Sequence, residues 1–153
     1  MSTKNKVNFS ENQLTLIYNN LESACRYLDE VYDVDNGGCC FVAYCIARVL
    51  EKDNIPFSVI VYECFEETFE DIDCSQYHYA IKFNEEIVNK FYECDYTEYN
   101  YVSSRMLLEH YKECNWNTQY NSDKNKYIQL VLTTTYNDTK EEILQGQCDS
   151  SEQ

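Results

Sequence analysis

The sequence predicts an α+β fold, in which N-terminal helices pack on an antiparallel β-sheet. Two stretches with helical spacing of apolar residues, 10–32 and 39–53, come first along the chain. Short runs of alternating or β-branched residues follow them, at 57–62, 77–83 and 87–92. Because a tight turn joins neighbouring antiparallel strands whereas parallel strands need a long crossover, this order predicts an antiparallel meander.

The two N-terminal helices each carry a start or stop signal. Ser10 and Gln13 have the spacing of a capping box, which predicts the start of the first helix. Pro56 disfavours helical geometry at the residue before it, so the second helix should end near Asp53. The apolar stripe of the second helix follows the i, i+3, i+4, i+7, i+8 pattern, with Val42, Cys45, Ile46, Val49 and Leu50.

The C-terminal part of the chain predicts a third helix and a closing strand. Residues 103–114 have a serine cap and helical composition, and His110 falls on a polar, solvated part of that helix. Residues 126–136 are rich in Leu, Val and Thr, which favours a last long strand. We therefore expect one domain over residues 1–136, followed by an acidic, flexible tail over 137–153 with a short helical patch at 141–144.

The charge balance limits the classes of partner. The chain of 153 residues has 12 Lys and Arg against 27 Asp and Glu, a net charge of −15. Such a surface repels nucleic acid and anionic lipid, so a neutral or basic peptide or protein is the expected partner. With no apolar segment at the N-terminus and no apolar run near 20 residues, we expect a cytoplasmic protein. Low Gly and Pro with abundant Asn and Tyr suit an AT-rich phage or bacterial genome.

The cysteines do not indicate a metal or a dithiol site. There are nine of them, at irregular positions and without a C-x-x-C pair, and only two histidines. Zinc sites and redox pairs need closer spacing, so we expect no metal and no cofactor. Most of the cysteines are expected to be reduced residues of the core.

One cysteine, Cys39, lies at a position that favours nucleophilic chemistry. Residues 36–40, Asn-Gly-Gly-Cys-Cys, lead from a turn into the second helix. A helix N-terminus carries roughly half a positive charge and unpaired N–H groups, which favour a thiolate and an oxyanion. With about 100° per residue, Cys39 lies roughly 60° from the centre of the apolar face and Cys40 roughly 160° from it. Cys39 is therefore predicted to face the sheet, and Cys40 to face away.

His78 and Asn89 are the predicted partners of Cys39. If residues 84–85 form a two-residue hairpin loop, Asn89 lies diagonally across from His78 on one face of the sheet. His78 would then act as the base, and Asn89 would hold its imidazole in one tautomer. Asn36 is the candidate for an additional oxyanion contact. The predicted chemistry is attack of the Cys39 thiolate on an acyl carbon, through a thioester.

These residues resemble the papain-like and transglutaminase-like cysteine peptidase superfamily. The resemblance rests on Gly-Gly-Cys39 at the start of a helix, Ala43 four positions on, and Asn54-Ile55-Pro56 before the first strand, where the family has Gly-Ile-Pro. His78 and Asn89 match the family's histidine and its Asp or Asn in order and approximate spacing. The resemblance implies a papain-like core and a Cys39–His78–Asn89 triad with hydrolase or acyltransferase activity.

Two alternatives remain open. Arylamine N-acetyltransferases carry a similar Gly-Gly-x-Cys, which would assign the nucleophile to Cys40. The second alternative is a papain-like scaffold that has lost catalysis and binds a protein partner, as a viral accessory or structural protein.

Overall fold

The computed structural model describes residues 8–32, 38–65, 75–90, 95–99, 103–113 and 122–146. In this part of the chain, four helices and one four-stranded antiparallel sheet form an α+β architecture, which confirms the predicted class at that level. The elements in chain order are α1 Glu11–Tyr32, α2 Cys39–Lys52, β1 Ser58–Phe65, β2 Ser75–Phe83, β3 Glu86–Val88, β4 Tyr96–Tyr99, α3 Ser104–Glu113 and α4 Ser122–Leu144.

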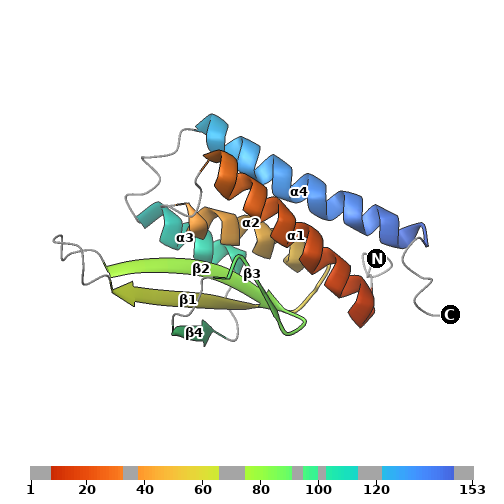
Figure 1. Ribbon diagram of the computed structural model, residues 1–153, viewed down its shortest axis with the longest axis horizontal. Coiled ribbons are helices and arrows are strands. Elements are labelled where there is room, and N and C mark those ends of the chain that lie inside the picture. Colours follow the sequence, from red (N-terminus) through yellow and green to blue (C-terminus); the bar gives the residue numbers. More distant parts are fainter. Residues whose placement is uncertain are drawn as a thin grey trace.

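The sheet has the strand order β3-β2-β1-β4, and the helices lie on one side of it (Figure 1). Phe83 pairs with Glu86 across a two-residue loop, as predicted. Both loop residues, Asn84 and Glu85, have positive φ, as in the type I′ turns that match the strand twist. The third strand is shorter than predicted, because β3 ends at Val88 and Asn89 has a φ of 65°.

Helix α2 forms the centre of the molecule. It lies between β2 and α4, with α3 beside it (Figure 1). Ten of its fourteen side chains are buried, so nearly every side of the helix faces other parts of the fold. Arg48, Glu51 and Lys52 are exposed, on the side of the helix opposite its apolar stripe. The outer helices α1 and α4 run side by side, and α1 also reaches β3.

Local signals set the ends of the N-terminal helices. The Ser10 N–H donates to Gln13 Oε1 (2.8 Å) and the Gln13 N–H donates to Ser10 Oγ (3.1 Å), which confirms the capping box. At the end of α2, Asn54 has a φ of 60°, and the Ile55 N–H donates to the carbonyl of Leu50 (3.0 Å). Asn tolerates this left-handed geometry, which terminates the helix before Pro56.

The predicted strand over residues 126–136 is wrong. These residues belong to α4, and its buried side chains are spaced for a helix: Ile128, Leu132, Tyr136, Thr139 and Ile143. The Leu, Val and Thr run fits a strand by propensity, but the apolar surface of α1 and α2 selects the helical spacing. The helix continues through 137–144, the first part of the predicted tail, and residues 147–153 lie outside the described residues.

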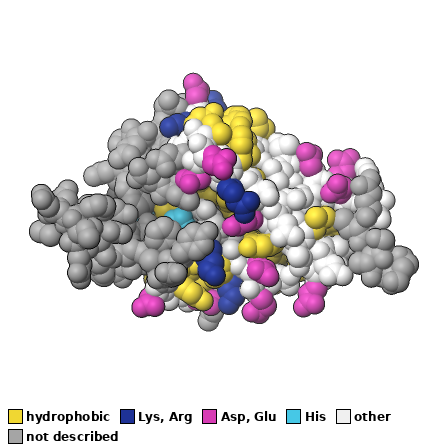
Figure 2. All heavy atoms as spheres, viewed as in Figure 1, with side chains coloured by type: hydrophobic (Ala, Val, Ile, Leu, Met, Phe, Trp, Pro, Cys, Tyr) yellow, Lys and Arg dark blue, Asp and Glu magenta, His cyan; other side chains and the backbone are white. Residues whose placement is uncertain are grey.

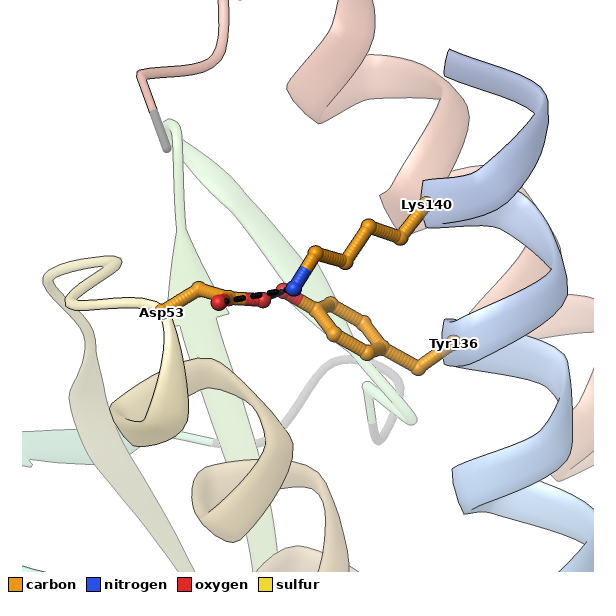
Figure 3. A network of polar contacts seen from close by, with 3 residues as sticks. All are labelled: Asp53, Tyr136 and Lys140. Carbon is orange, nitrogen blue, oxygen red and sulfur yellow. Dashed lines mark hydrogen bonds and ion pairs between the residues drawn. The ribbon is translucent and has the colours of Figure 1, made fainter. Parts of the chain in front are cut away.

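A buried polar network joins α4 to the end of α2 (Figure 3). The Tyr136 hydroxyl donates to Asp53 Oδ2 (2.5 Å), and Lys140 Nζ lies 3.0 Å from Asp53 Oδ1. Burial, followed by the hydrogen bond to Asp53, raises the pKa of the Tyr136 phenol. Asp53 is 6% exposed, so both partners are needed to compensate its lost hydration.

Substitution of two leucines in α4 distinguishes the helix from the predicted strand. Leu132 is fully buried and Leu130 is 60% exposed, whereas in a strand the two side chains would share one face. We expect Leu132→Ala to lower the free energy of unfolding by about 2–5 kcal/mol, and Leu130→Ala to change it by less than about 0.5 kcal/mol. Urea unfolding measures both, and equal losses would contradict the helix.

Candidate functional site

The Cys39 thiol lies against strand β2. Cys39 is the first residue of α2, after the cap residue Gly38, and it is 1% exposed. The Tyr79 N–H donates to Cys39 Sγ (3.5 Å), so the thiol meets the sheet as its place on the helix predicted. The helix N-terminus and this N–H both favour the thiolate, while burial disfavours it.

His78 is held by the end of β3. Its Nε2 lies 2.7 Å from the carbonyl oxygen of Asn89, and the side chain is 6% exposed. A carbonyl can only accept, so Nε2 carries a proton and neutral His78 leaves Nδ1 as its proton acceptor. The Asn89 N–H donates in turn to Glu22 Oε1 of α1 (2.8 Å). Asn89 therefore contacts His78 through its main chain, whereas the sequence predicted its side-chain amide.

The Cys39 thiol and the ring of His78 lie on different sides of β2. The His78 ring packs on Tyr62 (5.9 Å between centroids), and Tyr62 and Ala80 form a cluster on the face of the sheet away from α2. Tyr79 and Ile81 belong to the core with Cys39. The Cys39 sulfur meets the peptide group that joins His78 to Tyr79. Proton transfer between Cys39 and His78 stays a prediction, and Asn36 lies outside the described residues.

The other two cysteines of α2, Cys40 and Cys45, are buried residues of the core. Cys40 was predicted to face away from the sheet. It contacts α3, which buries it fully, and its Sγ lies 3.6 Å from the Leu107 carbonyl oxygen. Burial raises the pKa of the Cys45 thiol to about 12, against the opposite effect of Arg48. Cys45 lines a groove of about 450 Å³ between α2, α3 and α4. A thiol with such a pKa is not a nucleophile at neutral pH.

The pairing of His110 with Tyr79 was not predicted. His110 is exposed on α3, as expected, but its Nε2 lies 2.5 Å from the Tyr79 hydroxyl. The pair lines a cleft of about 490 Å³ between α3 and the sheet, together with Leu107. Leu107 and His110 are three residues apart on one helix face. This spacing, which the prediction for His110 did not use, is the signal for a position beside the cleft.

The remaining structural observations and comparisons do not assign a function. No three or more His, Cys, Asp or Glu side chains among residues 8–32, 38–65, 75–90, 95–99, 103–113 and 122–146 are grouped to hold a metal ion. None of the helices described is long and apolar enough to cross a membrane. The chain matches no family model, no curated protein and no solved structure. Function therefore has to be inferred from the residues and their geometry.

The raised pKa of Cys45 predicts a loss of stability at alkaline pH. Above a pH of about 9 an unfolded chain releases this proton, whereas the folded chain retains it up to about 12. Stability conferred by the neutral thiol is thus complete below pH 9 and falls as the pH rises. Between pH 8.5 and 10.5, the free energy of unfolding is expected to fall by about 2 kcal/mol less in Cys45→Ala than in the unmodified protein. Urea unfolding at both pH values measures this difference, and an identical loss in both proteins would contradict it.

Proposed function

We propose that this protein is a cysteine hydrolase or acyltransferase of papain-like type, with Cys39 as nucleophile and His78 as base. The observation that supports it is that the Cys39 sulfur contacts the strand that carries His78, and that the end of the next strand holds the His78 ring. The Cys39 sulfur lies 3.5 Å from the Tyr79 nitrogen, and the preceding residue, His78, lies 2.7 Å from the Asn89 carbonyl oxygen. The helix of Cys39, the strand of His78 and the end of the next strand also follow the order expected from the resemblance.

The proposed reaction uses the two nitrogens of His78 differently. Nε2 is occupied by the Asn89 carbonyl, so Nδ1 accepts the thiol proton. The Cys39 thiolate then forms a bond to the acyl carbon, while N–H groups at the start of α2 stabilise the oxyanion. When the intermediate collapses, the leaving group departs with the proton from Nδ1 and a thioester remains. Water or a second acceptor then takes the acyl group and releases the thiol.

Charge favours a neutral or basic substrate. The chain carries −15, and acidic side chains are spread over the face drawn in Figure 2. Because a negative surface raises the local concentration of cations, a peptide with Lys or Arg near the acyl group is the preferred substrate class. Cys39 is 1% exposed, so the structure around it has to open before such a peptide reaches the sulfur.

A second proposal is a binding scaffold without catalysis. It is favoured by the burial of both thiols at the start of α2, where Cys39 is 1% exposed and Cys40 is fully buried. A thiol that serves only packing has no need of a base or of access to substrate. In this role the protein binds a peptide or protein on its surface.

The reactivity of Cys39 distinguishes the two proposals. We expect Cys39 to be alkylated by iodoacetamide below pH 8 at least tenfold faster than Cys40. The Cys39 sulfur accepts from the Tyr79 N–H and in this proposal gives its proton to His78, whereas the Cys40 sulfur faces the Leu107 carbonyl. His78→Ala should remove this difference. Mass spectrometry at several pH values measures each site separately, with Cys40 as the internal control. Equal, slow alkylation of the two cysteines would support the scaffold instead.

The contribution of Asn89 is tested by glycine substitution. Its contact with His78 is made by the main-chain carbonyl and its φ is 65°, a geometry that glycine adopts without cost. We therefore expect Asn89→Gly to leave the alkylation rate of Cys39 within about twofold of the unmodified rate. If a side-chain amide is required, as in a Cys-His-Asn triad, the rate will instead fall about as far as in His78→Ala.

A further inference from the structure

We propose that edge strand β4 and the adjacent cleft form a docking surface for an extended, basic segment of another protein. The segment pairs with β4 as an added strand and places apolar side chains in the cleft. This inference gives the binding role proposed above a surface and a partner class. It does not depend on cysteine chemistry.

Strand β4 offers its outer edge for pairing. It ends the sheet in the order β3-β2-β1-β4, and among the described residues only β1 pairs with it. All four residues of Tyr96–Tyr99 are exposed. The outer N–H and C=O groups of an edge strand form a template for one more strand.

The cleft takes the apolar side chains of such a segment. Tyr99 lies on the cleft side of β4, opposite Val59 of β1, and Met106 of α3 lies across from them. Tyr99 is 46% exposed and Met106 is 54% exposed, although both line an apolar cleft of about 490 Å³. Side chains alternate along a strand, so every second residue of an added segment enters the cleft.

The other face of β4 selects positive charge. Tyr96 and Glu98 lie there, next to Tyr62 and Lys82 on the neighbouring strands. Glu98 already forms an ion pair with Lys82 (3.3 Å), so the feature of this face that favours a Lys or Arg side chain is the aromatic ring of Tyr96, which is 47% exposed. The segment is therefore expected to alternate apolar and basic residues.

Net charge also argues against a second copy of this chain as the occupant. Two chains of −15 repel each other at a small interface, whereas a basic segment is attracted at long range. Pairing of β4 with β4 would in addition bring like charges, Glu98 and its copy, onto one sheet face. Charge complementarity thus favours a basic partner.

Fluorescence anisotropy with a labelled eight-residue peptide of alternating Lys and Leu tests this surface. A peptide with the four Lys and four Leu in two blocks has the same composition and charge, but cannot send apolar and basic side chains to opposite faces. We expect the alternating peptide to bind at least tenfold more tightly than the block peptide. Equal affinities would overturn the proposal, because charge alone would then explain binding.

Two arginine substitutions locate the binding. Met106→Arg places a positive charge at the cleft, while Leu130→Arg makes the same charge change at a 60% exposed position of α4. We expect Met106→Arg to weaken binding of the alternating peptide at least tenfold, and Leu130→Arg to change it less than twofold. Tyr99→Lys provides a second variant at the cleft, and circular dichroism checks that each variant is folded. Equal effects at the two arginine sites would overturn the proposal.

Two further measurements separate this surface from the cysteine site and from self-association. Cys39→Ser should bind the alternating peptide as the unmodified protein does, so failure of the docking surface and failure of the cysteine site are observed independently. Sedimentation measures the oligomeric state without peptide. A dimer that Met106→Arg dissociates would overturn the proposal in favour of self-association through β4.

Discussion

The burial of α2 is the constraint on which the rest of the fold depends. The sheet covers one side of this helix, α4 covers another, and α3 lies beside it. Burying a single Val, Leu or Ile side chain contributes roughly 1.5–3 kcal/mol, and ten side chains of α2 are buried. Each covering layer therefore gains its stability largely from contact with the same helix. The Asp53 carboxylate then anchors the far end of α2 to Tyr136 and Lys140.

The burial of α2 has two opposite effects on the Cys39 thiol at the candidate site. The N-terminus of α2 and the Tyr79 N–H stabilise negative charge on Cys39, whereas the packing that holds the helix in place removes water from the sulfur. His78 has a defined tautomer, since the Asn89 carbonyl accepts from Nε2, and Asn89 is held by Glu22 of α1. These contacts serve catalysis if the start of α2 opens readily enough to expose the sulfur, and packing if it does not. The opening is a property of local stability.

Residue pairs close in sequence were predicted well. The capping box of Ser10 and Gln13, the bounds of α2 and the Asn84-Glu85 loop all depend on interactions within a few residues, and the structure agrees with each of them. Strand β4 was not predicted, because its four residues are all exposed and carry no alternation of burial. The helix α4 was mistaken for a strand over 126–136, since Val and Thr favour strands by propensity while the neighbouring helices decide which residues are buried.

The sequence by itself determined the α+β class, the acidic surface, the helix that starts at Cys39 and the hairpin that connects the strand of His78 to the strand that ends just before Asn89. These follow from periodicity, capping and turn chemistry, which act over short distances along the chain. Only the tertiary structure decided that Cys40 is covered by α3, that Asn89 meets His78 through its carbonyl, and that His110 pairs with Tyr79. Each of these contacts joins elements far apart in sequence or depends on one main-chain φ angle, and neither can be read from local patterns.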